Sequence, residues 1–145
     1  MTNLVLLIED NSSDEKLTLL AFQRAGVASQ FVVARDGAEA LAFFFDAPDG
    51  DAPLPSLVLL DLNLPKIEGL EVLRQLRAHE RTRLLPVVVL SSSKEREDVL
   101  RSHELGANGY VRKPVAFAEF ARAAKTIAEF WLTLNQSPVG LTHGV

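Results

Sequence analysis

The sequence predicts an α/β fold with a five-stranded parallel sheet between two layers of helices. Short apolar runs alternate five times with helical patterns along the 145 residues, and this alternation is typical of parallel βαβ units. The apolar runs also lack a polar residue at every second position, as expected for strands that helices cover on both faces. A chain of this length is sufficient for one domain of this kind.

The first two units each combine an apolar run with a clear helix start. Residues 4–8, "LVLLI", indicate a buried strand. In the helical segment that follows, Ser12 and Glu15 have the spacing of a capping box, and a glycine ends the pattern. Residues 31–34 are the second expected strand, and Asp36 is the expected start of the short helix "GAEALAFFF".

The third and fourth units follow a proline-rich segment. Residues 46–56, "DAPDGDAPLPS", contain three of the seven prolines and indicate an exposed loop. The third strand is expected over residues 57–60 and its helix over residues 67–78. The fourth strand is expected over residues 87–90, and residues 94–105 have the pattern of its helix.

The fifth unit ends in a long amphipathic helix. Residues 109–111 indicate a short strand, and residues 115–134 carry an apolar stripe at helical spacing. Phe130 lies beside this stripe and widens it, which indicates that a partner covers part of the helix. We expect a domain over residues 1–134 and a flexible tail over residues 135–145.

Composition excludes several classes of function. The net charge of -4 gives no basic face for nucleic acid, and without cysteine neither disulfides nor thiolate sites are available. The three histidines have no metal-ligand spacing, and no glycine-rich loop resembles a nucleotide site. No apolar stretch reaches the roughly 20 residues of a membrane span, and the N-terminus lacks the features of a signal peptide. We therefore expect a cytoplasmic protein.

Polar residues follow the apolar strands at one edge of the expected sheet. Glu9 and Asp10 follow the first strand, Asp61 the third, Ser91 ends the fourth, and Lys113 follows the fifth. The carboxyl ends of parallel strands are where open α/β sheets bind ligands. If the strand order is 2-1-3-4-5, Asp10 and Asp61 face each other across the switch point between the first and third strands.

This arrangement suits phosphoryl-transfer chemistry. Two carboxylates 4 Å apart repel by roughly 4 kcal/mol at an effective dielectric near 20, and a divalent cation removes that repulsion. Oxygen ligands with open positions for water suit Mg²⁺. The ammonium of Lys113 and the hydroxyl of Ser91 would stabilise a phosphoryl group in transit, with Asp61 as the nucleophile.

The same segments resemble the receiver domain of two-component response regulators. The matching pieces are "LLIEDN", "LVLLDLNLPKIEG", "VVVLSSS" and "GYVRKP", in order and at matching spacing. The resemblance implies a flavodoxin-like (βα)5 sandwich with strand order 2-1-3-4-5. It also implies a cis peptide between Lys113 and Pro114. The long loop, "LDLNLPK" and the terminal "EFW" are similar to single-domain regulators associated with bacterial phytochromes.

The resemblance implies a role for each matching metal and acceptor residue. Asp61 would be the phosphoacceptor, and Lys113 would pair with it and then with the phosphoryl oxygens. Asp10 and the backbone carbonyl of Asn63 would bind Mg²⁺ directly, while Glu9 would act directly or through water. Glu9 stands where Asp is common in the family, which moves one carboxylate outward by a methylene.

The resemblance also implies a switch and a set of partners. Ser91, at a position where Thr is frequent, would hydrogen-bond the phosphoryl group, and Tyr110 would change rotamer on activation. The phosphodonor would be a sensor histidine kinase, and the narrower resemblance implies a bacterial phytochrome. A homodimer through the fourth helix, fifth strand and fifth helix would be the usual assembly. The protein would catalyse only its own phosphorylation and dephosphorylation.

Three other interpretations fit part of the pattern. A buried salt bridge between Asp61 and Lys113 without any chemistry would explain these two residues alone. A phosphatase of the haloacid dehalogenase type also uses a strand-end Asp and Mg²⁺. Such an enzyme needs a second Asp two residues later as general acid, where this chain has Asn63. A non-phosphorylated module with the same fold generally lacks the acceptor or the lysine, and this chain has both.

Overall fold

The computed structural model describes residues 3–46 and 53–139. Its five strands form one sheet in which all pairs are parallel and the order is β2-β1-β3-β4-β5. The strands are β1 (Leu4–Ile8), β2 (Gln30–Ala34), β3 (Leu57–Leu60), β4 (Val87–Ser91) and β5 (Gly109–Arg112). The predicted fold class and strand order are confirmed, and each strand range was right to within one residue at either end.

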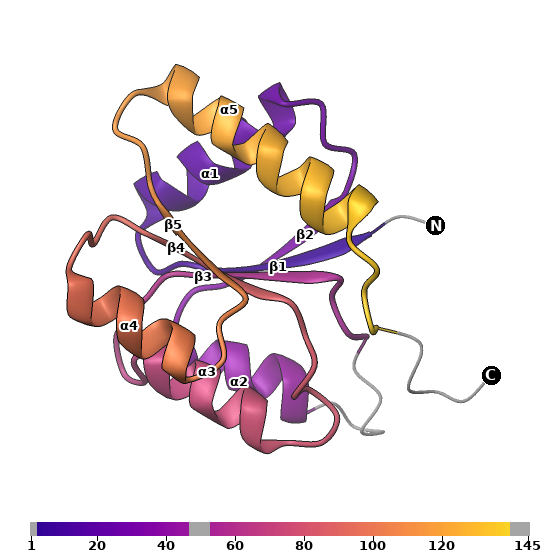
Figure 1. The fold of residues 1–145 in the computed structure, drawn as a ribbon, viewed down its shortest axis with the longest axis vertical. Helices are drawn as coiled ribbons and strands as arrows, with labels where there is room; N and C mark the ends of the chain where they lie inside the picture. The colour runs from indigo at the N-terminus through magenta and orange to yellow at the C-terminus, as the bar shows by residue number, and fades with distance from the viewer. Residues whose placement is uncertain (1–2, 47–52, 140–145) are drawn as a thin grey trace.

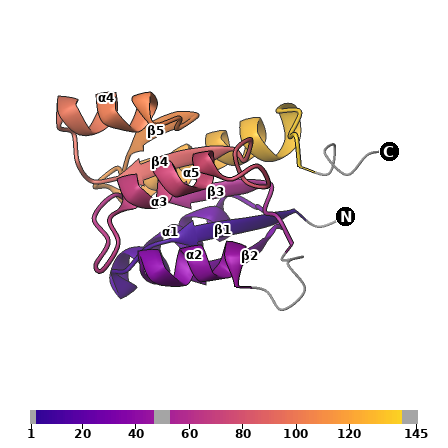
Figure 2. The same ribbon diagram turned by 90° about the horizontal axis from the view of Figure 1, so that it is seen from below.

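The helices cover both faces of the sheet. They are α1 (Ser12–Arg24), α2 (Gly37–Phe45), α3 (Gly69–Ala78), α4 (Arg96–Glu104) and α5 (Phe117–Ala128). Figure 1 shows α1 and α5 on one face and α2, α3 and α4 on the other, and Figure 2 gives a second view of these layers. Within the described residues, no helix is both long enough and apolar enough to cross a membrane.

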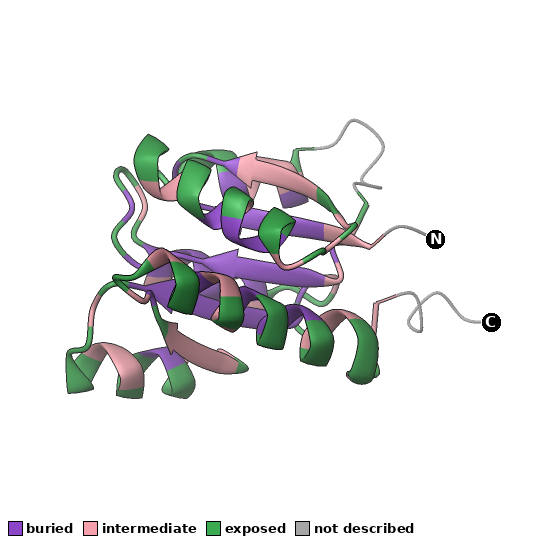
Figure 3. Ribbon diagram, turned by 90° about the horizontal axis from the view of Figure 1, so that it is seen from above, coloured by how far each residue is buried: buried purple, intermediate pink, exposed green. Residues whose placement is uncertain are grey.

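Alternate residues of the central strands belong to two separate apolar clusters. In β1, Leu6 and Ile8 belong to the cluster under α2 and α3, while Val5 and Leu7 belong to the cluster under α1 and α5. Successive side chains of a strand point to opposite faces, so a strand buried on both faces needs apolar residues at every position. Figure 3 shows these buried central strands between helices whose outer sides are exposed.

The starts of the helices differ from the predicted ones. The expected capping box is wrong, because Asn11 precedes α1 and its Oδ1 accepts a hydrogen bond of 2.9 Å from the Asp14 N–H. The prediction for α2 is confirmed, since Asp36 caps this helix through a 2.7 Å bond from the Glu39 N–H. The third, fourth and fifth helices each begin two residues later than expected.

The end of the chain departs from a simple long helix. The α-helix stops at Ala128 and continues as a π-helix, η1 (Glu129–Leu134). Of the expected flexible tail, residues 135–139 are described, and Val139 packs against the cluster under α2 and α3. Residues 140–145 lie outside the described part of the chain. The domain boundary at residue 134 therefore stays a prediction.

Two further expectations are corrected in part. Of the expected exposed loop, residues 47–52 lie outside the described residues, but Pro55 is buried and Leu54 packs against the apolar cluster. The loop therefore returns to the core before β3 begins. The described residues contain no cis peptide, so the bond between Lys113 and Pro114 is trans, unlike the one that the resemblance implies.

Candidate functional site

Three of the predicted site residues meet at the carboxyl edge of the sheet. Glu9 directly follows β1, Asp61 directly follows β3, and Lys113 directly follows β5. The Lys113 ammonium donates to Glu9 Oε1 at 2.5 Å and to Asp61 Oδ2 at 3.3 Å. All three side chains are buried. The sheet therefore brings together residues that are as many as 104 positions apart in the sequence.

A fourth member of this cluster, Asp14, was missed in the sequence. Its Oδ2 accepts a hydrogen bond of 3.0 Å from the Lys113 ammonium. One oxygen each of Glu9, Asp14 and Asp61 lies within 4.8 Å of the other two, so the three could hold a metal ion. Asp14 lies in the first turn of α1, where an acidic residue is common because it interacts favourably with the helix dipole. The sequence thus gave no reason to assign Asp14 to the site.

The two other predicted metal ligands are placed differently. Asp10 is exposed and lies outside the three-carboxylate group. Asn63 has an exposed side chain, and its backbone N–H donates to Asp61 Oδ1 at 3.1 Å, which holds the Asp61 carboxylate in place. Metal binding by Asp10 and by the Asn63 carbonyl remains a prediction.

Burial and crowding of the carboxylates raise the affinity of this cluster for protons. Burial, followed by the neighbouring Asp61, raises the pKa of Glu9 to about 7 from its ordinary 4.5. Burial alone would lower the pKa of Lys113, but Glu9, Asp61 and Asp14 together raise it, so the ammonium stays charged. Burial is thus the first cause of the shift of the Glu9 pKa, whereas the three carboxylates raise the pKa of Lys113 against the effect of burial. Such an oxygen-rich site fits a divalent cation.

The two predicted switch residues, Ser91 and Tyr110, both contact Ser93 in the loop that follows β4. Ser91 is buried, and its hydroxyl accepts a hydrogen bond of 3.2 Å from the Ser93 N–H. The hydroxyl of Tyr110, on β5, donates to the Ser93 carbonyl oxygen at 2.8 Å. Ser93 also donates to Asp98 of α4 at 2.6 Å. The hydrogen bonds of Ser93 therefore connect Ser91 to both β5 and α4.

The loop after Asp61 is held close to the site by a glycine. A Cβ at Gly69 would lie 2.5 Å from the Asp61 carbonyl oxygen and 2.7 Å from the Leu62 Cα, so only glycine fits here. Lys66, in the same loop, has a positive φ of 66° and forms an ion pair of 3.2 Å with Asp36. These contacts fix the path of the chain beside Asp61.

A groove adjoins the cluster between α1 and the segment after β5. Its volume is about 240 Å³, and its lining is largely apolar apart from Asp14, Ser92 and Lys113. Leu17, Val115 and Phe117 form part of its apolar wall. An incoming group that occupied this groove would contact the ammonium of Lys113 and the carboxylate of Asp14.

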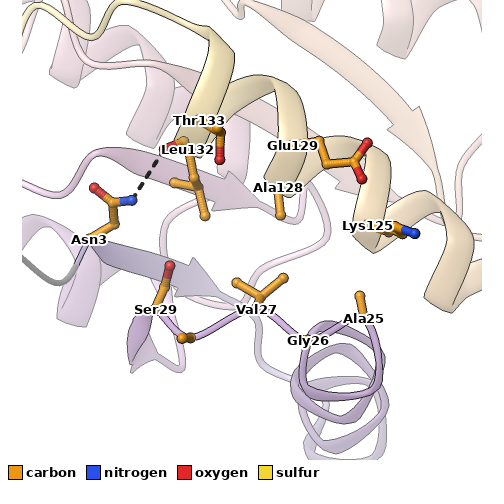
Figure 4. Close-up of a pocket in the computed structure, with 11 residues that line it drawn as sticks. Asn3, Ala25, Gly26, Val27, Ser29, Lys125, Ala128, Glu129, Leu132 and Thr133 are labelled. Atoms are coloured by element: carbon orange, nitrogen blue, oxygen red, sulfur yellow. Dashed lines mark hydrogen bonds between the residues drawn. The ribbon is translucent and has the colours of Figure 1, made fainter.

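A second hollow, of about 570 Å³, lies at the opposite edge of the sheet. It is bounded by Asn3, by residues 25–29 before β2, and by the end of α5 with η1. Figure 4 shows this pocket, in which Asn3 Nδ2 donates to the Leu132 carbonyl oxygen at 3.3 Å. Strands β1 and β2 begin at this edge, whereas the acidic cluster follows the carboxyl ends of strands. The hollow is therefore separate from the candidate site.

Carboxylates, a lysine and a hydroxyl lie together at the carboxyl edge of a doubly wound parallel sheet, where such folds bind ligands. The chain belongs to the response regulator receiver domain family, whose model matches residues 5–125. It is 41% identical to the probable methanogenesis regulatory protein FilR2 of Methanothrix harundinacea, over 93% of this chain and 87% of that protein.

Solved structures of phytochrome response regulators have the same fold. The phosphorylated cyanobacterial regulator RcpA matches with a TM-score of 0.87 and 36% identity, covering 95% of this chain and 99% of that one. Response regulator Rcp1 of Synechocystis is 35% identical over 88% of each chain, and its Mn²⁺-bound structure matches with a TM-score of 0.84. The chain is thus similar to single-domain phytochrome response regulators, as the sequence predicted.

Proposed function

We propose that the protein is a phosphorylation-controlled switch that accepts a phosphoryl group from a histidine kinase on Asp61. The observation that carries this proposal is the contact of 3.3 Å between Asp61 Oδ2 and the Lys113 ammonium, inside a cluster of carboxylates with too little positive charge. A buried carboxylate in such a place favours binding of a cation, and the cation and Lys113 would then neutralise the negative charge that a phosphoryl group adds.

The residues of the cluster have separate parts in the proposed reaction. An Asp61 oxygen attacks phosphorus, the bond between phosphorus and the donor nitrogen breaks, and its electron pair leaves with the donor ring. Lys113 then pairs with the phosphoryl oxygens, and the Ser91 hydroxyl donates to one of them. Asp61, Glu9, Asp10 and the Asn63 carbonyl would hold Mg²⁺, which supplies charge neutralisation when bound.

The proposed signal leaves the site through the loop after β4. If Ser91 turns toward the phosphoryl group, its bond with the Ser93 N–H is lost, and Ser93 is also the residue that Tyr110 and Asp98 contact. The populations of the conformations that the loop, β5 and α4 adopt would then shift together. Tyr110, which is half-buried, would move into the space that the loop leaves.

The proposed output surface consists of α4, β5 and α5, and we propose that it forms a homodimer. Leu100 on α4, with Phe130 and Leu134 in η1, are large apolar side chains that remain exposed. Sedimentation velocity of the full chain should show a dimer that Phe130→Ser and Leu134→Ser weaken at least tenfold. A monomer at all accessible concentrations, with and without phosphorylation, would contradict this part of the proposal.

The proposed phosphodonor is a bacterial phytochrome acting in the cytoplasm. The similarity to RcpA, a cyanobacterial phytochrome response regulator, supports this choice. A panel of kinases from the same genome, each phosphorylated on histidine and mixed with the chain, would test it. Transfer within seconds from the phytochrome and not from the other kinases is the expected result.

The competing functions make different predictions at the same site. A phosphatase of the haloacid dehalogenase type would need an acid at position 63, where Asn63 has an exposed amide. A non-phosphorylated module would leave Asp61 unmodified. The receiver proposal therefore depends on stable phosphorylation of one aspartate.

Mass spectrometry after incubation with phosphoramidate or acetyl phosphate and Mg²⁺ tests the proposal directly. One adduct of about 80 Da, the mass of a phosphoryl group, is expected on the native chain and is absent from Asp61→Asn. Lys113→Ala should still accept the group but should fail to change the output surface. An adduct that persists in Asp61→Asn, or no adduct on the native chain with either donor, would refute the proposal.

A further inference from the structure

Asp14 contacts the Lys113 ammonium but has no part in the reaction proposed above. We propose that Asp14 determines which phosphodonors the site accepts. Its carboxylate favours donors that release phosphorus from a nitrogen carrying positive charge, and it disfavours acyl phosphates, which release an anion. This inference rests on the proposed phosphoacceptor function of Asp61.

The exposure of the three carboxylates places Asp14 on the outer side of the cluster. The side chain of Asp14 is 40% exposed, whereas those of Glu9 and Asp61 are 1% and 9% exposed. Asp14 also lines the groove of about 240 Å³, and neither Glu9 nor Asp61 does. A donor seated in this groove would therefore meet the carboxylate of Asp14 before it reached Asp61.

The lining of the groove suits a ring better than a free anion. Leu17, Val115 and Phe117 offer apolar contacts, and Asp14 is the negative group of the lining. The positive group of the lining, Lys113, is already paired with the buried carboxylates of Glu9 and Asp61. A nitrogen heterocycle such as a phosphorylated imidazole has an apolar body and can carry a proton on its second nitrogen. The apolar wall accommodates the body, and Asp14 stabilises the positive charge.

The two donor classes leave different charges in the groove. With a phosphoramidate, the new bond joins an Asp61 oxygen to phosphorus and the broken bond is P–N. The electron pair stays on a nitrogen that is already protonated, so a neutral amine leaves. With acetyl phosphate, the broken bond joins phosphorus to the acyl oxygen, and acetate leaves as an anion. The charge of Asp14 raises kcat/KM for the first donor, because it attracts the cationic nitrogen, which still carries part of its charge in the transition state, and it lowers kcat/KM for the second donor, because it repels the developing acetate.

A purely structural role for Asp14 predicts another result. If Asp14 served only to hold Lys113, its loss would change the rate by the same factor for every donor, because Lys113 contacts the phosphoryl group that all donors share. The ratio of rates between donors, and not either rate alone, is therefore the quantity to measure.

The experiment compares the full-length wild-type protein with Asp14→Asn and Asp14→Ser at saturating Mg²⁺. Phosphorylation by phosphoramidate and by acetyl phosphate is followed by mass spectrometry. We expect the phosphoramidate-to-acetyl-phosphate rate ratio to fall about tenfold in both variants, and by less at high salt, because salt screens this half-exposed charge. Glu15→Gln is the matched control, because Glu15 pairs with Arg35 at 3.0 Å instead of with Lys113. Its ratio should equal that of the wild type.

Equal changes with both donors, or an unchanged ratio in folded Asp14 variants, would overturn the role proposed for Asp14. A fall of the same size in Glu15→Gln would also overturn it, because the effect would then be one of net charge. If the wild-type protein accepts phosphorus from neither donor, the phosphoacceptor function itself fails. The two failures are thus distinguishable.

Discussion

Replacing Asp61 by Asn should stabilise the metal-free protein. Asp61 is buried beside two other carboxylates and one ammonium, so its charge is both attracted and repelled within the cluster. Asparagine has nearly the same shape, and its side-chain oxygen can keep the hydrogen bond that Asp61 Oδ1 accepts from the Asn63 N–H. The substitution therefore removes a charge with little change in packing.

The distances in the cluster give the sign and size of the effect. At an effective dielectric near 20, the Lys113–Asp61 contact of 3.3 Å is worth roughly 5 kcal/mol of attraction. Repulsion of Asp61 by Glu9 and by Asp14, each within 4.8 Å, is worth roughly 3.5 kcal/mol per pair. Repulsion exceeds attraction by about 2 kcal/mol, and solvent reduces the share of the half-exposed Asp14. Above the pKa of about 7 that Glu9 has in the cluster, where Glu9 is charged as well, we expect Asp61→Asn to raise the free energy of unfolding by about 1 to 2 kcal/mol.

Urea denaturation followed by circular dichroism, first with EDTA and then with Mg²⁺, measures this gain. With EDTA the variant should unfold at higher urea than the wild type. With Mg²⁺ the wild type should gain stability by mass action, and the variant should gain much less. Ser91→Ala is a control, since it alters the same site without removing charge and should not raise stability. An Asp61→Asn variant that is no more stable than the wild type in EDTA would refute the charge balance.

Three further predictions concern other parts of the structure. Arg77→Met should cost about 2 to 3 kcal/mol in urea denaturation, because the Arg77 guanidinium donates to the Gly106 carbonyl at 2.7 and 2.9 Å and to the carbonyl of the buried Leu85 at 2.8 Å, and its loss leaves both acceptors unpaired; an equally stable variant would contradict this. The free energy of unfolding of the metal-free protein should fall by up to about 3 kcal/mol as the pH rises from 5 to 8. The reason is that the pKa of Glu9 is raised from 4.5 to about 7, and between these values only the folded state holds the proton. Glu9→Gln should flatten this profile, and an unchanged profile would contradict the assignment. Gly69→Ala should lower both stability and the rate of phosphorylation. Gly26→Ala should cost only about 1 kcal/mol of stability from its positive φ, since nothing lies within 4 Å of a Cβ there. Equal effects in the two variants would exclude a role for the close approach at Gly69.

The sheet was predictable because its determinants are local. Uninterrupted apolar runs marked every strand, and the polar residue directly after a run marked where it ended. The positions of Glu9, Asp61 and Lys113 followed from that pattern together with the strand order. Parallel strands place their carboxyl ends at one edge, so a linear pattern became a three-dimensional cluster without further information.

The parts that were missed depend on contacts that the sequence does not mark. Asn11 and Ser12 are both good capping residues, and which one caps α1 depends on where the chain leaves β1. Asp14 looks like any acidic residue in a first helical turn. The π-helix after Ala128 keeps a periodic apolar pattern, so a continuous α-helix was the natural expectation. Each error concerns a choice between local states of similar energy, which tertiary packing decides.

The carboxylates of the site stay close together because the backbone of the sheet fixes their positions. Ile8 and Leu60 are paired neighbours in the parallel ladder, and the Asp61 N–H donates to the Ile8 carbonyl oxygen at 3.0 Å. The carboxylates of Glu9 and Asp61, each one residue further, are therefore held side by side. Separating them would require breaking this ladder and exposing apolar residues on both faces of the sheet, at about 25 cal/mol for each Å². The repulsion consequently remains in the folded protein, where binding of a cation would relieve it.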